Sequence, residues 1–392
     1  MNTFITADPH PAYARWRAEG PIRQVPLPGG EQVWLVTEYE TGRQALADPR
    51  LSKAPRDAGS YSETDRALNM HMLSADPPDH TRLRKLLSGA FTSRRIESLR
   101  PRVEQITDTL LDEMSAHEQA DLLNAFTVPL PIQVICELLG IPDADRDTFR
   151  VWSGHIVAGV DPTGEVTSQT LQSTTTAFLA YIRDLLRQRR TRLGDDLLSG
   201  LIAVRDDEDR LSEDELTSMV FMLLIAGTET TANLLGNGSF LLLSERERWE
   251  RLRLGRELLP EAIEEFLRYE SSLKFSTGRI AAEDFELAGA PIRAGDVVMV
   301  SLLAVNRDPS RFDSPGELRL SRTPNSHLAF GHGIHRCIGA PLARMEAMIA
   351  FDRLLTRFPR LRLAVPAEQV TWRPRLLIRG LDALPVHTGA RR

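Results

Sequence analysis

The chain has 392 residues, of which 42% are hydrophobic and 26% are charged, and its formal net charge is -6. This balance is typical of a globular protein and excludes an intrinsically disordered one. The acidic net charge argues against a nucleic-acid-binding protein, whose binding face carries an excess of lysine and arginine. We therefore expect no nucleic-acid partner.

The N-terminal residues, MNTFITADPHPAY, hold neither a basic segment nor an apolar run, so no signal peptide is predicted. The longest apolar stretch, residues 219–227, is far shorter than the roughly 20 residues that span a bilayer. Two cysteines, Cys136 and Cys337, are too few for a disulfide framework and suit a reducing compartment. We expect a cytoplasmic protein with no membrane partner, and a buried, inert thiol at Cys136.

Residues 21–37, PIRQVPLPGGEQVWLVT, alternate apolar and polar positions around a Pro-Gly-Gly turn, which predicts a β-hairpin. Amphipathic helices follow from residue 79 onward, in HTRLRKLLSGAF, RVEQITDTLLDEM, PLPIQVICELLG and residues 171–186. Residues 159–164, GVDPTG, are expected to connect two of these helices. Each amphipathic helix needs a partner for its apolar face, so a large helical core is predicted.

Residues 212–246 predict one long helix, which begins with a capping box of Ser212 and Glu215 and contains no proline. At 1.5 Å per residue it would reach about 50 Å, long enough to cross a domain. Its middle is apolar on all sides, as in a core helix, yet it contains Gly227, Glu229 and Thr230. Burying such polar groups costs several kcal/mol unless they are paired, so these residues need a further explanation.

After residue 270 the pattern changes to short segments punctuated by glycine and proline, which predicts small sheets, and residues 309–327 are expected to be irregular. No internal repeat and no flexible linker is present. The expected fold is mainly α with a small β portion, in a single helix-rich domain over residues 1–392 with a long central helix.

The stretch 328–347, LAFGHGIHRCIGAPLARMEA, contains the second cysteine. Pro341 fits the first turn of a helix, so Cys337 is expected just before a helix N-terminus, where the helix dipole favours a thiolate. Gly331, Gly333 and Gly339 permit tight turns and leave room for a flat, bulky group. This environment suits a thiolate bound to a metal.

Other roles for Cys337 explain the stretch less well. A zinc site of His332, His335 and Cys337 lacks the usual ligand spacing, and nothing suggests the oxyanion hole that a cysteine nucleophile needs. The glycines do not match the G-x-G-x-x-G phosphate loop. A buried structural thiol stays open, although three glycines and two histidines are an odd setting for it. Haem-thiolate ligation accounts for every residue type.

Residues 330–339, FGHGIHRCIG, resemble the F-x-x-G-x-x-x-C-x-G haem-binding loop of the cytochrome P450 family in its bacterial form. Glu265 and Arg268 resemble the E-x-x-R motif of that family, and residues 226–231, AGTETT, resemble its oxygen-activation segment. His80 and Arg84 resemble the pair that holds a haem propionate. The resemblance extends over roughly residues 10–390, in the right order.

The resemblance implies haem b (iron protoporphyrin IX) as cofactor, with Cys337 as the proximal iron ligand. Thr230 and Glu229 would be catalytic residues that deliver protons to dioxygen; the family more often has Asp at the second position, which leaves the relay geometry open. Ala226 and Gly227 would leave space for dioxygen. The other implied haem contacts are His80, Arg84, Arg279 and His335 at the propionates, with Phe330, Gly331 and Gly339 in the loop.

Glu265 and Arg268 are also expected to form a buried structural network with Arg322 beneath the haem loop. Substrate contacts are expected from mostly apolar stretches, which are residues 61–73, residues 150–180, the helix near Phe221, and residues 273–277 and 376–378.

The resemblance further implies a monooxygenase that uses O2 and hydroxylates a largely apolar small molecule, of the polyketide or macrolide type made in secondary metabolism. The chain ends 55 residues after Cys337, which leaves no room for a fused flavin or iron-sulfur domain, so electrons are expected from a separate ferredoxin and ferredoxin reductase. Arg94, Arg95, Arg336 and Arg344 are candidates for a basic patch that attracts them. The alternative is a non-catalytic haem-thiolate binding or sensor protein, but Glu229 and Thr230 favour the enzyme because a binder needs no proton relay.

Overall fold

The computed structural model describes residues 6–54, 61–159, 166–194, 196–203 and 211–389. They form two compact units. The first contains residues up to 52, residues 107–128 and residues from 230 onward, and the second contains residues 53–106 and 129–229. The fold is mainly helical with small sheets, as predicted. A single domain over the whole chain stays a prediction.

The predicted hairpin is present in the first unit as β1 (Ile22–Pro26) and β2 (Gln32–Val36), which pair antiparallel. β2 pairs in parallel with β8 (Val297–Val300), and β5 (Arg279–Ala281) and β3 (Leu51–Ser52) complete a five-stranded sheet in the order β1-β2-β8-β5-β3. β6 (Phe285–Leu287) and β7 (Ala290–Ile292) form a separate hairpin.

Alternate residues of this sheet belong to two different core clusters. Val298 and Val300 pack in one cluster, whereas Met299 between them packs in the other. Because successive side chains of a strand point to opposite faces, the sheet buries both of its faces. β5, which carries Arg279, pairs antiparallel with β8 in this sheet.

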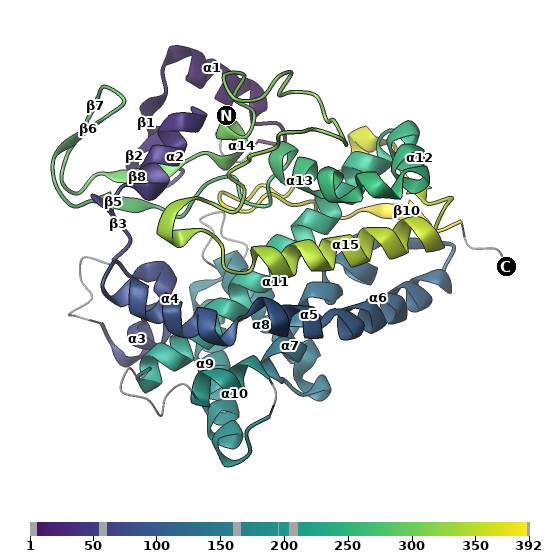
Figure 1. The fold of residues 1–392 in the computed structure, drawn as a ribbon, viewed down its shortest axis with the longest axis horizontal. Helices are drawn as coiled ribbons and strands as arrows, with labels where there is room; N and C mark the ends of the chain where they lie inside the picture. Colours follow the sequence, from purple (N-terminus) through teal and green to yellow (C-terminus); the bar gives the residue numbers. More distant parts are fainter. Residues whose placement is uncertain (1–5, 55–60, 160–165, 195, 204–210, 390–392) are drawn as a thin grey trace. The chain divides into compact units, whose positions relative to one another are not determined.

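Several further elements belong to the first unit. Its helices are α1 (His10–Glu19), α2 (Tyr39–Ala47), α12 (Arg246–Leu254), α13 (Leu259–Tyr269), α14 (Leu302–Val305) and α15 (Ala340–Arg357), with short turns η4 (Leu123–Thr127), η7 (Arg256–Leu258), η8 (Gly333–His335) and η9 (Ala367–Gln369). A second sheet has the order β4-β10-β9, with β4 (Gln119–Asp121), β9 (Arg362–Leu363) and β10 (Pro385–His387). In Figure 1, α13 lies beside α15, against which it packs.

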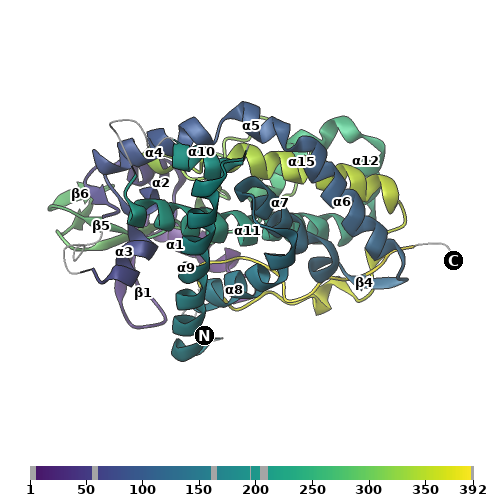
Figure 2. The same ribbon diagram turned by 90° about the horizontal axis from the view of Figure 1, so that it is seen from below.

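The regular elements in the described part of the second unit are all helices or helical turns. It contains α3 (Glu63–Asn69), α4 (Asp79–Ala90), α5 (Ser93–Ser98), α7 (Pro129–Leu139), α8 (Arg146–Gly159), α9 (Ser168–Thr191) and α10 (Leu197–Ala203), with turns η3 (Met72–Ser74) and η5 (Asp143–Asp145). α8 and α10 pack against the long α9, and both also contact α7 (Figure 2). The predicted connection GVDPTG begins at the end of α8, and its residues 160–164 lie outside the described part of the chain.

Two helices contribute residues to both units, α6 (Arg100–Ser115) and α11 (Glu213–Leu243). α11 is the long helix predicted from the sequence, and its capping box is present: the Ser212 amide donates to Glu215 at 2.7 Å, and the Glu215 amide donates to Ser212 Oγ at 3.1 Å. Among the described residues, α11 alone is long and apolar enough to pass as a membrane span, but 67% of its apolar window is buried. α11 is therefore interpreted as a core helix.

Candidate functional site

The loop around Cys337 is held in shape by its own backbone. The amide of Cys337 donates to the carbonyl of Phe330 at 2.9 Å, and the amide of Gly331 donates to Leu328 at 2.8 Å. Gly331 and Gly333 both have a φ of 72°, a left-handed conformation that other residues adopt at a cost. The predicted tight turns are therefore present, and they return the chain so that Cys337 lies close to Phe330.

Gly333 is also required by packing. A Cβ atom at this position would lie 2.8 Å from the carbonyl oxygen of Leu46 and 3.0 Å from Cα of Ala47, at the end of α2. Both of these are backbone atoms, which cannot rotate away. The loop is thus seated directly on the backbone of α2, and only glycine fits at the contact.

Cys337 lies just before α15, whose N-cap is Gly339 and whose first turn contains Pro341, as predicted. The thiol of Cys337 is exposed, whereas burial raises the pKa of the Cys136 thiol to about 12. Exposed amide groups at a helix start favour a negative charge, so the position of Cys337 favours a thiolate. The two cysteines therefore differ in environment: Cys136 is a buried thiol in a helix, whereas Cys337 is exposed just before one.

A cation lies beside the same loop. The guanidinium of Arg344 stacks over the ring of Phe330, 4.6 Å from its centroid, and binds both carboxylate oxygens of Glu264 at 2.6 and 2.7 Å. The pKa of Arg344 is raised, chiefly by the hydrogen bond to Glu264 and also by the charge of Cys337. In return, the positive charge of Arg344 favours the thiolate form of Cys337.

Glu264 has a second partner in His327, whose Nε2 lies 3.1 Å from its carboxylate. Nδ1 of the same ring accepts from the amide of Ala329, so Nε2 carries the proton and donates. Burial alone would raise the pKa of Glu264, but the bonds from Arg344 and His327 outweigh it and lower the pKa to about 2. Glu264 is therefore an anion that ties α13 to the cysteine loop.

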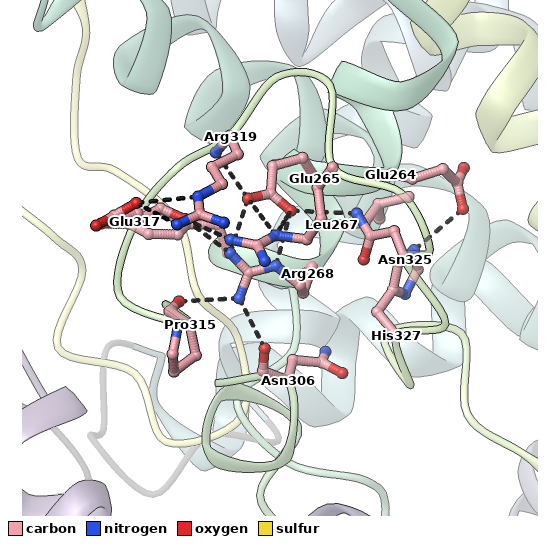
Figure 3. Close-up of polar contacts among 12 residues, drawn as sticks. Glu264, Glu265, Leu267, Arg268, Asn306, Pro315, Glu317, Arg319, Asn325 and His327 are labelled. Atoms are coloured by element: carbon pink, nitrogen blue, oxygen red, sulfur yellow. Dashed lines mark hydrogen bonds and ion pairs between the residues drawn. The ribbon is translucent and has the colours of Figure 1, made fainter. Parts of the chain in front are cut away.

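The neighbouring residue, Glu265, is the centre of the predicted buried network (Figure 3). Its carboxylate accepts from Arg268 at 2.7 and 2.8 Å and from Nε of Arg322 at 3.0 and 3.1 Å. Glu265 and Arg268 are fully buried. Two contacts were not predicted, the side-chain amide of Asn325 and the backbone amide of Arg319, both of which also donate to Glu265.

Asn306 connects this network to the start of the cysteine loop. Its carbonyl accepts from Arg268 at 2.9 Å, and its side-chain oxygen accepts from the amide of Leu328 at 2.7 Å. Asn306 is fully buried. Sequence reasoning missed this residue, because an asparagine in AVNRDP gives no sign of a partner 22 positions away.

α4 carries His80 and Arg84 one turn apart. His80 is 2% exposed, and burial, with the charge of Arg84, lowers its pKa, so the ring is held as a neutral hydrogen-bonding group. α4 is anchored to the first turn of α11 by an ion pair between Arg82 and Glu215. The adjacent Asp214 binds Arg66 of α3 at 2.9 Å. The acidic first turn of α11 therefore fixes the helices around His80 and also complements the helix dipole.

The middle of α11 differs from its buried surroundings. Ala226 is exposed, and Glu229 and Thr230 are half-buried, although Leu224 and Thr231 on either side are buried. Gly227 has a packing reason that the sequence did not show: a Cβ there would lie 3.2 Å from Cδ1 of Ile135 in α7. Gly227 therefore accommodates a neighbouring helix, and the space for dioxygen beside the exposed Ala226 stays a prediction.

Five of the predicted site residues lie in one loop: Phe330, Gly331, His335, Cys337 and Gly339. Three others, Ala226, Glu229 and Thr230, lie on α11, and His80 and Arg84 lie on α4. Arg279 is buried on β5. Within the first unit, an exposed cysteine before a helix and glycines at positive φ fit the implied haem. Phe221, expected to face the substrate, packs 5.6 Å from the buried ring of Phe178. It is thus at least partly a core residue.

The four arginines of the predicted basic patch differ in exposure and in their contacts. Arg336 and Arg94 are exposed, but Arg344 is bound to Glu264 and Arg95 donates to the carbonyl of Ala90 at 2.8 Å. A basic patch that attracts an acidic electron carrier stays a prediction.

Comparison with known proteins agrees with this geometry. A sequence model of the family described as Cytochrome P450 matches residues 13–139 and 162–369. The cytochrome P450 monooxygenase PikC of Streptomyces venezuelae is 47% identical over 386 residues, which cover 97% of this chain and 91% of that protein. The polyketide biosynthesis cytochrome P450 PksS of Bacillus subtilis (strain 168) is 41% identical over 391 residues, with 97% and 95% covered. The solved structure of tirandamycin C-bound P450 monooxygenase TamI has a TM-score of 0.89 at 48% identity and covers 99% of each chain.

Proposed function

Because this chain belongs to the cytochrome P450 family and is a haem-thiolate monooxygenase, we propose that it hydroxylates a largely apolar small molecule of the polyketide or macrolide type. The observation that carries the site assignment is the exposed thiol of Cys337 in its glycine loop before α15. The substrate class is supported by the name of PksS, which refers to polyketide biosynthesis, and by the tirandamycin C bound to TamI.

Haem supplies the reductive activation of dioxygen, so that R–H, O2, two electrons and two protons become R–OH and water. Cys337 would hold the iron as a thiolate, stabilised by the start of α15 and by Arg344. Arg279, His335, His80 and Arg84 would hold the propionates through charge-assisted hydrogen bonds.

Proton delivery is assigned to two half-buried residues of α11. The hydroxyl of Thr230 would hold a proton at Oγ1 and donate it towards the place where dioxygen would bind. Glu229, which is half-buried and so accessible to water, would replace that proton from solvent. The exposed Ala226, one turn earlier on the same helix, would leave room for the oxygen molecule.

Enzymes of this family need electron donors, and for this chain we propose a ferredoxin with its ferredoxin reductase, in the cytoplasm. An acidic ferredoxin would be attracted by the exposed Arg336 and Arg94. Raising the ionic strength should then slow reduction by ferredoxin, and Arg336→Glu should reduce that dependence on salt. If the rate of reduction were independent of ionic strength in both the parent protein and Arg336→Glu, the basic patch would be excluded from the proposal.

The function is tested first by spectroscopy. The reduced, carbon-monoxide-bound protein should show the haem-thiolate absorption band, and Cys337→Ser should lose it. A spin-state titration over a panel of macrolides, other polyketides, fatty acids and steroids then identifies ligands.

Turnover in isotopically labelled dioxygen should place one labelled oxygen atom in the product of a polyketide ligand. Labelled product from a steroid or fatty acid alone would overturn the substrate class. Haem binding without labelled product from any polyketide of the panel would likewise overturn the substrate class.

A further inference from the structure

A serine outside α11 binds the backbone of the proposed proton-delivering threonine. The hydroxyl of Ser272 donates to the carbonyl oxygen of Thr230 at 2.7 Å, although the two residues are 42 positions apart. Ser272 lies just after α13 and is 8% exposed, so water competes little for this bond. A carbonyl has two lone pairs, and within a helix it accepts this second donor beside the intrahelical amide.

Ser272 also ends a short ladder of extended backbone. Its carbonyl accepts from the amide of Arg379 at 2.8 Å, and the next residue, Leu273, forms an antiparallel bridge with Ile378. The amide of Lys274 continues the ladder with a 2.8 Å bond to the carbonyl of Leu377. The two sides of this ladder, residues 273–277 and 376–378, are the segments expected to contact substrate.

The following turns of α11 meet the same ladder. The side-chain amide of Asn237 donates to the carbonyl of Arg379 at 3.0 Å. A Cβ atom on Gly380 would lie 2.2 Å from Oδ1 of Asn233, so the side chain of Asn233 packs directly against this backbone. Thr230, Asn233 and Asn237 are spaced i, i+3 and i+7, which places them on one face of the helix. The bond from Ser272 is thus the first of several contacts along that face.

We infer that Ser272 is a positioning residue for Thr230. Its hydroxyl fixes the peptide group that follows the threonine, and it links that peptide group to the ladder expected to face the substrate. The orientation of the Thr230 side chain would then depend on a residue outside α11. This inference rests on the proposed role of Thr230 in proton delivery.

The test compares Ser272→Ala with Ser272→Thr, which keeps the hydroxyl, and with Ser244→Ala. Ser244 is a matched control because its hydroxyl also donates at 2.7 Å to a carbonyl of α11, that of Phe240, near the C-terminal end of the helix. All three are prepared with haem bound. Hydrogen exchange is measured for amides of residues 228–236, together with the product and hydrogen peroxide formed per electron pair.

Ser272→Ala should exchange about fivefold faster in this part of α11, the factor that corresponds to losing a hydrogen bond worth about 1 kcal/mol. It should also release more hydrogen peroxide at unchanged haem content. Ser272→Thr should stay close to the parent protein in both measurements, and Ser244→Ala should leave both unchanged. In a Thr230→Ala background, Ser272→Ala should cause no further loss of coupling, because both changes act through the same hydroxyl.

The inference would be overturned if Ser272→Ala had the same amide hydrogen exchange and the same product yield per electron pair as the parent protein. It would also be overturned if Ser272→Ala lowered that yield further in the Thr230→Ala background. Failure of the proposed function has a different signature. Thr230→Ala itself would then remain fully coupled, while faster exchange in Ser272→Ala would still report the contact between the two residues.

Discussion

Nε of Arg322 lies 3.0 and 3.1 Å from the two carboxylate oxygens of Glu265, a residue 57 positions earlier in the chain. Arg268 binds the same two oxygens from within α13, and the second guanidinium charge is compensated by backbone carbonyls, including those of Asn306 and Pro315. Because the set is buried, no water replaces a missing member. The network joins α13 to the irregular segment that leads into the cysteine loop.

Glu265→Gln should therefore destabilise the protein strongly. Two arginines would remain buried without their anion, and removing one member of a buried charged set costs about 3–5 kcal/mol. We expect a matching fall in the free energy of unfolding in urea and a large loss of bound haem, measured from the haem absorbance per chain.

Glu317→Gln is the control for that experiment. Glu317 supplies only its backbone carbonyl to Arg268 and Arg322, while its exposed carboxylate pairs with Arg319 at the surface. It should keep full haem content and lose less than about 1 kcal/mol, as for exposed pairs. Normal haem content in Glu265→Gln would contradict the structural role of the network.

Gly333→Ala tests the seating of the cysteine loop on α2. The added methyl group would meet backbone atoms of Leu46 and Ala47 and would also hold a positive φ, which costs about 1–3 kcal/mol by itself. Haem content and the haem-thiolate band of the carbon-monoxide spectrum should both decrease.

Gly289→Ala separates the effect of the positive φ from the effect of the contact with α2, because Gly289 has a φ of 83° with nothing within 4 Å of its Cβ position. It should lose some thermal stability and keep a normal spectrum; an equal spectral loss in both variants would exclude the contact with α2 as the cause.

Thr230→Ala should keep haem and bind substrate, but it should divert electrons to hydrogen peroxide. The methyl group can no longer donate a hydrogen bond or pass a proton. The measurement is the ratio of hydroxylated product to reductant consumed, with Thr230→Ser as the variant that retains the hydroxyl and should retain most coupling. An unchanged ratio in Thr230→Ala would argue against proton delivery by this residue.

Glu346 in α15 should make stability depend on pH. It is 2% exposed, and burial raises its pKa from 4.5 to about 8. Between these values the folded protein holds a proton that the unfolded chain has released, so the free energy of unfolding falls as pH rises from about 4.5 to about 8, by up to about 1.4 kcal/mol per pH unit. Below this window both states are protonated and the effect vanishes.

Glu346→Gln should remove this slope and therefore be more stable than the parent protein at pH 8, measured by urea unfolding across the window. The exposed Glu368→Gln serves as the control and should leave the slope unchanged. Parallel stability curves for the parent protein and Glu346→Gln would show that Glu346 is not protonated in the folded state.

The sequence was sufficient to predict those elements whose signal is local and those sites whose motif resembles a known family. The hairpin, the capping box at Ser212 and the helix start at Pro341 follow from residues a few positions apart, and the structure confirms all three. The contacts of Asn306 and Ser272 could not be predicted, because each joins segments 22 or more positions apart through a single polar side chain. The pairing of β4 with β10 joins residues near 120 to residues near 386, and no local sequence pattern predicts it.

The shape of the cysteine loop is set by glycines at positive φ, by internal backbone bonds and by the end of α2. These constraints leave few backbone torsions of residues 328–339 to be fixed by a ligand, so binding at this loop would cost little chain entropy.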